Sequence, residues 1–391
     1  TASAITASQT ITSTGNITTS GTLNTPSING EQIGGRRNIV INGAMQVAQR
    51  STSVTGLGNS NGYNTLDRFG YFGSSSGRFT QSQDTDAPDG FSKSLKIACT
   101  TADTSIAATE YLHLNYSIEG QDLQQLNYNT SSAKSTTISF YVKGNASATY
   151  TFRLQYHKSG GTARWYAKEF PVTTSWVRQT ITIPGDTDTS SSYGIVDDAN
   201  TGMFLIWYLH GGTNYSSGTH VSETWEDRDY TKALGNNQTS FYDSTARTFS
   251  ITGLQMEVGS QATPFEHRSF GEELVSCLRY YEKIEGADGS RGVSSYVLGG
   301  GVWYATNQLL ASLQFNGIKR VSPAISTSSS GAIKAYRNGA AVTSNDTDGM
   351  FDQIEEKSAR INFTPASNGT AGHGTLIQMV AGESVEIDAE L

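Results

Sequence analysis

The stretch GMFLIWYLHG, residues 202–211, holds the longest apolar run of the sequence and decides how the chain folds. That run, MFLIWYL, has the length of a β-strand and is far shorter than the roughly 20 apolar residues that span a bilayer. Both faces of the stretch are apolar, whereas a strand with one wet face alternates apolar and polar residues. We therefore expect 202–211 to be a central strand covered on both faces. No basic-then-apolar signal segment is found, and we expect no membrane insertion.

Strand-like runs recur around this stretch, from residue 36 to about residue 268, and clusters of Gly, Asn, Asp and Ser separate them. The other runs are SLKIACT (94–100), EYLHLNYSI (110–118), STTISFYVKG (135–144), TYTFRLQYH (149–157), RWYAKEFPV (164–172), VRQTITIPG (177–185) and TFSITGLQMEV (248–258). Short strands with such punctuation are typical of a β-sandwich, and we expect a jelly-roll-like domain over 36–268. Its long loop 211–247 is either functional or loosely ordered.

A helix and a second β domain complete the expected organisation. In SFGEELVSCLRYYEKI, Ser269 and Glu272 form a capping-box pattern, which predicts a linking helix over 269–285. One face of that helix holds Leu274, Cys277, Leu278 and Tyr281, so Cys277 is expected to be buried. The remaining strand-like runs are GVWYATNQLLASLQF (301–315), AIKAYRNGAAVT (332–343), SARINFTP (358–365), TLIQMVAG (375–382) and SVEIDAEL (384–391). They predict a C-terminal β tip domain over 286–391, with a hairpin turn at Asn338-Gly339.

The N-terminal segment, residues 1–35, repeats every six residues. In AITASQTITSTGNITTSGTLNT (4–25), every even position from 6 to 24 is Thr, Ser or Asn. The apolar members of the repeat are Ile5, Ile11, Ile17 and Leu23. One apolar residue per hexad buries no core within one chain, so such units become stable by stacking on neighbours. We expect a trimeric β shaft with these four residues as its core; the alternative is a disordered Ser/Thr linker. A continuous β-helix and three separate strands both fit the pattern.

Composition supports an all-β chain and excludes several classes of protein. Of 391 residues, 36 % are apolar and 16 % charged, with 41 Gly against 7 Pro. The net charge of −8 argues against nucleic-acid binding, which needs a basic face. Two cysteines, Cys99 and Cys277, form no disulfide framework and indicate folding in a reducing compartment, although one bridge between them is conceivable.

Motifs for catalysis or metal binding are missing from the sequence. It holds no P-loop, Rossmann fingerprint, HExxH or GxSxG pattern. Its histidines are scattered singly, and the nearest pair, His210 and His220, lacks a partner at zinc-ligand spacing. Acidic clusters at 84–90, 186–190 and 345–349 fit plain turns, with bound calcium as the alternative. We expect no enzyme, no metal and no cofactor.

Two kinds of side chain remain as candidates for function. The acidic group Glu223, Glu226, Asp227 and Asp229 surrounds Trp225 and is the best candidate for glycoside hydrolysis; a solvated acidic loop is the alternative. Aromatic side chains stack on sugar rings while neighbouring polar groups bind hydroxyls. The candidate glycan contacts are Trp165, Tyr166, Trp225, Tyr230, Trp303 and Tyr304. Trp176 and Trp207 are expected in the core.

A series of phrases in fixed order resembles a known family. The phrases are NIVINGAMQVAQR (38–50), LDRFGYF (66–72), STTISFYVKG (135–144), WVRQTITIP (176–184) and ITGLQMEVGSQATPFEHRSFGEELVSCLRYYEK (251–283). They resemble the carbohydrate-binding-module-like β-sandwich of bacteriophage tail fibres and related virion proteins, especially of marine phages. The resemblance covers roughly residues 36–285, and the N-terminal repeat resembles the shaft segments that precede such domains.

The resemblance implies a fibrous, trimeric virion component, assembled in the host cytoplasm, and supplies no catalytic or sugar-binding residues. The expected partners are other copies of the chain, virion proteins through the N-terminal segment, and host-surface polysaccharide or lipopolysaccharide. We therefore expect a receptor-binding tail fibre protein. The alternatives are a capsid decoration, head-fibre or tail-adaptor protein without receptor binding, and a polysaccharide depolymerase.

Overall fold

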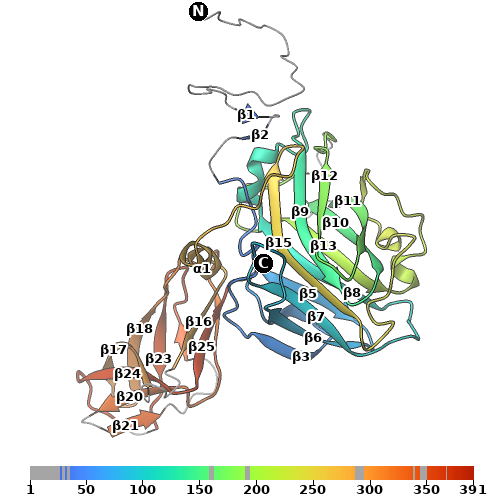
Figure 1. Cartoon of the computed structure of the whole chain (residues 1–391). Coiled ribbons are helices and arrows are strands. Elements are labelled where there is room, and N and C mark those ends of the chain that lie inside the picture. Colours follow the sequence, from blue (N-terminus) through green and yellow to red (C-terminus); the bar gives the residue numbers. More distant parts are fainter. Residues whose placement is uncertain are drawn as a thin grey trace, which may run out of the picture.

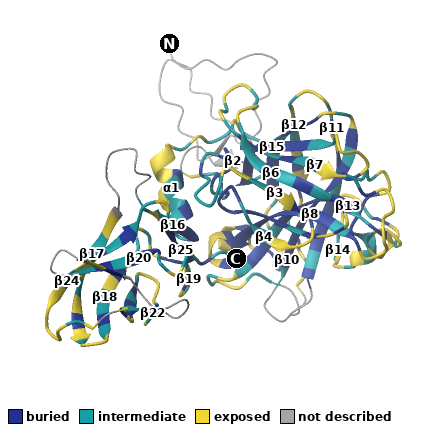
Figure 2. Ribbon diagram, turned by 90° about the horizontal axis from the view of Figure 1, so that it is seen from below, coloured by how far each residue is buried: buried dark blue, intermediate teal, exposed yellow. Residues whose placement is uncertain are grey.

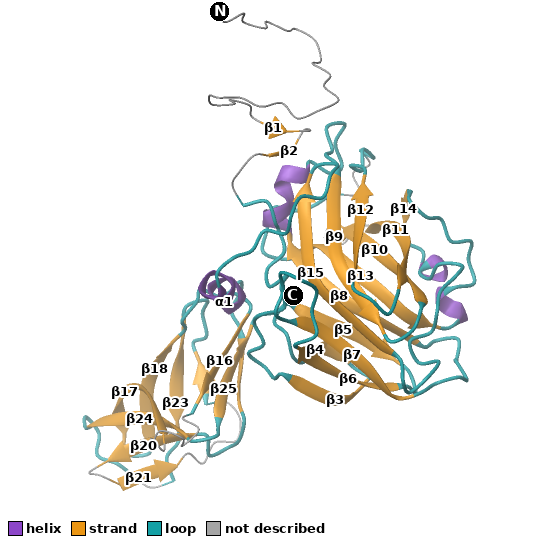
Figure 3. Cartoon of the chain, viewed as in Figure 1, coloured by secondary structure: helices purple, strands orange, loops and turns teal. Residues whose placement is uncertain are grey.

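The chain folds into two β units that lie side by side (Figure 1). The structure, a computed structural model, describes residues 27–28, 31–32, 36–157, 163–189, 194–286, 295–337, 340–343, 350–366 and 368–391. Strands dominate both units (Figure 3), which confirms the all-β fold class. Within the N-terminal segment, β1 (Ser27–Ile28) pairs with β2 (Glu31–Gln32). The predicted shaft residues Ile5, Ile11, Ile17 and Leu23 lie outside the described residues, so the shaft stays a prediction.

Two antiparallel sheets form the larger unit, a β-sandwich. One sheet has the order β12 (Val177–Ile183), β9 (Thr136–Gly144), β15 (Thr248–Val258), β7 (Ser94–Thr101), β6 (Arg78–Asp84) and β3 (Ser53–Leu57). The other has the order β14 (Trp225–Asp227), β11 (Ala163–Val172), β10 (Ala148–His157), β13 (Thr201–Gly211), β8 (Tyr111–Glu119), β5 (Phe69–Ser74) and β4 (Asn61–Tyr63). Short 3-10 helices lie at Gly120–Leu126, Thr213–Tyr215 and Tyr230–Lys232. The predicted sandwich is thus confirmed.

The apolar stretch 202–211 lies in the central strand β13. It lies between β10 and β8, and its neighbours pair with it along most of its length. Alternate side chains, among them Leu205 and Trp207, face the core between the sheets, where the Trp207 ring meets Phe140 edge-on at 5.6 Å between centroids. The other side chains, Phe204, Ile206 and Tyr208, point to the outer face. Both faces are covered, as the sequence predicts.

The smaller unit consists of residues 281–391 and has its own apolar core. One sheet has the order β16 (Tyr281–Glu285), β25 (Ser384–Asp388) and β19 (Ala324–Thr327). The other has the order β21 (Ala340–Thr343), β20 (Ile333–Arg337), β24 (Gly374–Val380), β17 (Ser295–Ala305), β18 (Gln308–Gln314), β23 (Ser358–Phe363) and β22 (Phe351–Asp352). The pairing of β20 with β21 confirms the expected hairpin, whose turn at Asn338-Gly339 lies outside the described residues.

Between the units lies helix α1 (Phe270–Leu278), which the sequence predicts correctly at its start. Ser269 accepts a hydrogen bond from the Glu272 amide, and the Glu272 carboxylate accepts from the Ser269 amide, so the capping box is complete. Cys277 is buried, as predicted. Cys99 and Cys277 are both free thiols, so the conceivable bridge between them is absent. No helix of the described residues is long and apolar enough to cross a membrane.

The predicted helix range 269–285 is wrong at its end, because the helix stops earlier. It stops at Leu278, and Tyr281–Glu285 form strand β16, paired with β25 from the far end of the chain. Tyr281 therefore lies opposite Asp388 in a sheet and does not extend the helical face. Aromatic and β-branched residues favour strands, and this long-range pairing overrides the local helical spacing.

The C-terminus ties the smaller unit to the sandwich, and Figure 1 places it against the larger unit. Glu390 forms an ion pair with Arg68, whose side chain is only 1 % exposed and whose other terminal nitrogen donates to the Ser117 carbonyl at 2.6 Å. Beside α1, Arg279 donates two hydrogen bonds of 2.7 Å to the buried Glu119 carboxylate. The buried Arg68–Glu390 pair therefore links the smaller unit to the sandwich, and the partly exposed Arg279 links the end of α1 to it.

Candidate functional site

A cleft of about 720 Å³ lies on the outer face of the seven-stranded sandwich sheet. Its apolar and aromatic lining consists of Phe72, Tyr111, His113, Ala163, Phe204, Ile206, Tyr208, Tyr215 and Tyr230. Its polar lining consists of Asn115, Gln155, His157, Asn214 and Arg228. The volume lies in the range of roughly 300–1,000 Å³ that is usual for ligand sites, and an aromatic lining with a few polar groups is typical of them.

Strand register brings these side chains together. Residues that lie directly opposite in neighbouring strands point to the same face of a sheet. Tyr208 of β13 lies opposite His113 of β8, and His113 lies opposite Phe72 of β5. One row of the outer face is thus Tyr208, His113 and Phe72, and the next row pairs Ile206 with Asn115.

Aromatic rings form a continuous platform along the floor of the cleft. The His113 ring stacks on Phe72 at 5.3 Å between centroids with 19° between the planes, and on Tyr111 at 5.8 Å with 26°. Tyr208 meets the same imidazole at 4.8 Å. Stacked rings of this kind hold one another in place, so the platform is formed before any ligand arrives.

The imidazole of His113 is uncharged at neutral pH. Burial lowers the pKa of His113 to about 4, because the protonated ring would lose its hydration. Its Nδ1 atom is buried and has no hydrogen-bond partner among the described residues. The floor of the cleft is therefore an apolar stacking surface and carries no positive charge at pH 7.

Part of the loop 211–247 forms one wall of the cleft. Tyr215 packs against Tyr111 at 5.2 Å between centroids, and Tyr230 meets Tyr215 at 6.4 Å. The guanidinium of Arg228 lies over the Tyr230 ring at 5.0 Å. Tyr230 remains 50 % exposed, which leaves ring surface for a ligand. The sequence predicts that the loop 211–247 is either functional or loosely ordered. Its position in the wall of the cleft favours the first alternative.

A buried arginine anchors that wall to the sheet. Arg153 of β10 is fully buried, lies over the Trp165 ring at 3.6 Å and donates to the Ala233 carbonyl at 2.8 Å. It also donates to the Lys232 carbonyl. The loop is therefore held by its backbone, while its tyrosines stay free to face the cleft.

The polar groups of the cleft are amides and a guanidinium. Asn115 donates to the Ser117 hydroxyl at 3.0 Å, an arrangement that fixes its amide while the carbonyl oxygen stays available. Gln155, Asn214 and Arg228 add donors and acceptors around the aromatic floor. Apolar platforms with neutral hydrogen-bonding groups suit a polyhydroxylated ring, which presents C–H faces and hydroxyls. Among the described residues that line the cleft, none is acidic.

The six predicted glycan contacts lie at different places in the structure and differ in exposure. Tyr230 lines the cleft. Tyr304 is 69 % exposed, but on β17 of the smaller unit. Trp225 is partly buried and its indole donates to the Pro184 carbonyl at 2.7 Å. The remaining three are buried: Trp165 and Trp303 have no exposed surface and Tyr166 has 3 %.

The acidic group around Trp225 is engaged in structural contacts. Glu226 accepts from the Trp165 indole and from Lys232, both at 3.1 Å, and Asp227 pairs with an arginine at 3.1 Å. Glu223 pairs with a lysine, and Asp229 caps a short helix by accepting from Thr231. The hydrogen bonds that Thr231 donates to Asp229 lower the pKa of the Asp229 carboxyl group. None of the four acids lines the cleft.

Sequence reasoning missed most of the cleft floor, including Phe72, Tyr111, His113 and Tyr208. Alternation within 202–211 and 110–118 was a usable signal, because the outward positions of both strands carry large rings. Because both faces of 202–211 are apolar, the stretch predicts a strand covered on both faces, and that prediction does not point to a binding surface.

Comparisons with known proteins gave the following. The sequence matches no family model and no curated protein. The enzymatically active domain of tailspike protein 4 of bacteriophage CBA120 matches with 11 % identity and a TM-score of 0.29, over 56 % of this chain and 21 % of that one, so this chain spans about a fifth of it. The family 11 carbohydrate-binding module of Clostridium thermocellum, in complex with a β-1,3-1,4-mixed-linked tetrasaccharide, matches with 12 % identity and a TM-score of 0.29. The match covers 55 % of this chain and 99 % of that one. The N-terminal cellulose-binding domain of Cellulomonas fimi β-1,4-glucanase C matches with 11 % identity and a TM-score of 0.25, over 56 % of this chain and 100 % of that one. With TM-scores below 0.5, these likenesses carry no argument about what this chain binds.

Proposed function

We propose that the sandwich binds a host-surface glycan in its cleft, and that the chain is a fibre protein of a bacteriophage virion. The single observation that carries the glycan proposal is the cleft itself, where a stacked floor of Phe72, His113 and Tyr111 is surrounded by side-chain amides and one guanidinium. Stacking on C–H faces and hydrogen bonding to hydroxyls are the two interactions that a sugar offers.

Binding without cleavage fits the cleft better than hydrolysis. Glycoside hydrolysis needs two carboxyl groups on either side of the scissile bond. The described lining holds no carboxylate, and the acids that the sequence suggested are paired with Lys168, Lys232 or Arg164 or cap a helix. The cleft therefore acts as a receptor-binding site.

The N-terminal repeats supply the fibre part of the proposal. Three chains stacked through Ile5, Ile11, Ile17 and Leu23 would present three clefts to one cell surface. Linked sites gain overall affinity without any new contact, so a weak single cleft is enough for attachment. The segment 1–35 would also join the fibre to other virion proteins.

Point variants of the cleft test glycan binding. The full chain is applied to immobilised lipopolysaccharide and capsular polysaccharide of host cells, and binding is compared with that of Tyr230→Ala and His113→Ala. We expect each to weaken binding by roughly tenfold, about 1.4 kcal/mol, as for a contact that supplies one stacking ring. The matched control is Tyr296→Ala, because Tyr296 is 49 % exposed on the smaller unit. Equal binding by all variants would refute the cleft as the binding site.

One result would favour a rival function. If the wild-type chain binds no host glycan and does not block phage adsorption, it is a structural decoration or adaptor protein. The trimer is tested separately by light scattering of the full chain and of residues 36–391. We expect a trimer for the first and a smaller species for the second, and a monomeric full chain would contradict the shaft.

A further inference from the structure

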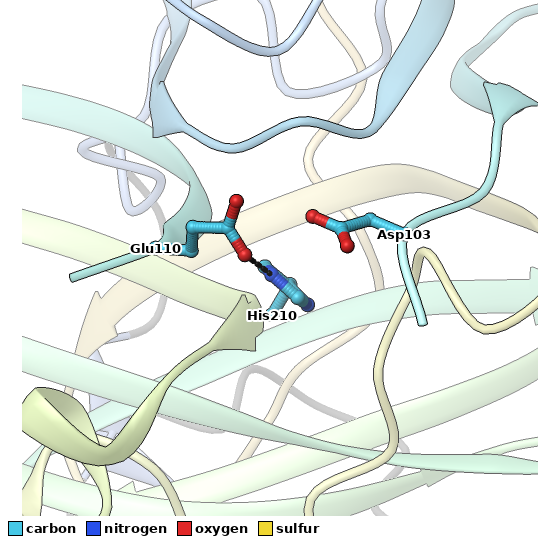
Figure 4. A group of neighbouring side chains, drawn as sticks. All are labelled: Asp103, Glu110 and His210. Carbon is cyan, nitrogen blue, oxygen red and sulfur yellow. Dashed lines mark ion pairs between the residues drawn. The ribbon is translucent and has the colours of Figure 1, made fainter. Parts of the chain in front are cut away.

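Three ligand-type side chains meet near the ends of strands β7, β8 and β13 (Figure 4). They are Asp103, in the connection from β7 to β8, Glu110, just before β8, and His210, near the end of β13. One ligand atom from each lies within 4.8 Å of the others. The three residues are 6 %, 8 % and 0 % exposed, in the order given.

A β-bulge directs His210 into this group. The pairing of β13 with β8 shifts between Tyr208 and His210, so that His210 lies opposite Leu112 and Tyr208 opposite His113. Leu112 points to the core and His113 to the cleft, so the extra residue turns His210 from the outer face to the inner one. Bulges that redirect a side chain are common beside functional sites.

The imidazole has an unused nitrogen that faces two carboxylates. Nδ1 of His210 lies 2.8 Å from the Ser240 hydroxyl, which already accepts from the Tyr242 amide at 3.1 Å. Nε2 is buried, has no hydrogen-bond partner among the described residues, and lies 4.0 Å from Glu110. A metal-binding histidine usually donates its other N–H to an acceptor such as Ser240.

Both carboxylates are held in place by hydrogen bonds, yet no lysine or arginine among the described residues pairs with them. Asp103 accepts from the Ser75 hydroxyl at 3.1 Å and from the Ser105 amide at 3.2 Å. Glu110 accepts from the amides of Ser76 at 3.0 Å and Ala107 at 2.9 Å.

Within the described part of the chain, neither carboxylate forms a salt bridge with a lysine or arginine. Two buried carboxylates this close repel each other and lose hydration. A bound cation removes both costs.

We propose that Asp103, Glu110 and His210 bind a divalent transition-metal ion, with Zn²⁺ as the best fit. One imidazole nitrogen and two carboxylate oxygens are zinc ligands, and three protein ligands leave a fourth position for water. Calcium, which takes six to eight oxygens, fits a set containing imidazole less well. The bound ion ties the β7–β8 connection to β8 and β13, which carry Tyr111 and Tyr208 of the cleft.

The spacing of the ligands explains why no sequence motif marks this site. The ligands lie 7 and 100 residues apart, at positions 103, 110 and 210, whereas the ligands of a recognisable zinc motif lie close together in the chain. The expectation that the chain binds no metal is thus replaced by this proposal.

Metal binding to the full chain tests the proposal. Protein dialysed against a chelator is titrated with ZnCl₂ in a calorimeter, and its melting temperature is measured with and without Zn²⁺. We expect one Zn²⁺ per chain and a melting temperature several degrees higher with the ion. Asp103→Asn and His210→Gln should each lower the Zn²⁺ affinity by at least a hundredfold.

Two comparisons separate metal binding from a structural role. His220→Gln is the matched control, because His220 is 8 % exposed and its Nε2 also lacks a partner in the described structure, but it belongs to no such cluster. It should bind Zn²⁺ like the wild type. Without metal, Asp103→Asn should melt no lower than the wild type, since it removes an unpaired charge. If a variant does not fold, the visible spectrum of the Co²⁺-loaded wild type reports imidazole and carboxylate ligands.

Two outcomes would overturn the site. One is a wild-type chain that takes up no Zn²⁺. The other is an affinity for Zn²⁺ that is equal in the wild type and His210→Gln.

Discussion

Replacing Glu390 by glutamine removes the only carboxylate that pairs with the buried Arg68 in the described structure. The Arg68 side chain is 1 % exposed and that of Glu390 is 4 %, so water cannot replace the lost charge. Removing one member of a buried ion pair costs about 3–5 kcal/mol. Arg68 keeps the Ser117 carbonyl and the Tyr280 ring, 3.4 Å from its guanidinium carbon, so we expect the low end, about 3 kcal/mol.

Calorimetric melting measures this effect. In domains of this size, 1 kcal/mol shifts the melting temperature by roughly 2–4 °C, so Glu390→Gln should melt about 6–12 °C lower. Asp388→Asn is the matched control two residues away, because Asp388 is 45 % exposed in its pair with Arg50. An exposed pair contributes at most about 1 kcal/mol. If the two variants melt within 2 °C of each other, the reasoning about the buried pair is refuted.

Three further predictions follow from buried groups. Because burial lowers the pKa of His113 to about 4 from 6.5, the unfolded chain binds a proton that the folded chain does not, and stability falls as pH decreases through that window. The free energy of unfolding, measured by urea titration, should differ less between pH 7 and pH 4.5 in His113→Gln than in the wild type, by at most about 3 kcal/mol; an unchanged difference would contradict this. Burial raises the pKa of both Cys99 and Cys277, so a thiol reagent should label neither in the native chain and both in denaturant. Gly369→Ala should destabilise by about 1–3 kcal/mol, since its Cβ would lie 2.1 Å from a tryptophan ring, whereas Gly374→Ala, with open space around it, should not.

The strands could be predicted from the sequence because their signal is local. A continuous apolar run located β13, strand-like runs between turn residues located β9 and β15 within a few residues, and the capping box located the start of α1. The end of the helix could not be predicted, because Tyr281 joins a strand whose partner begins at Ser384. Pairing over that distance leaves no trace in local spacing.

The cleft could not be predicted for the same reason, because it depends on contacts between residues far apart in the sequence. His113 was visible as one outward residue of a strand, but its contacts with Phe72 and Tyr208 depend on the register of three strands. Trp165 was a reasonable candidate by residue type, yet the Arg153 guanidinium and the loop backbone cover it. In Figure 2, the central strands β8, β10 and β13 of the cleft sheet are coloured as buried or intermediate, so residue type alone does not distinguish the cleft side chains from those of the core.

A structure of the chain with a bound oligosaccharide tests the central claim most directly. The sugar would be one that the glycan-binding assay identifies, at a concentration well above its dissociation constant. The account predicts sugar rings in the cleft, with a C–H face on the platform of Phe72, His113 and Tyr111 and hydroxyls near Asn115. Sugar bound elsewhere, such as at Tyr304 on the smaller unit, with an empty cleft would contradict it.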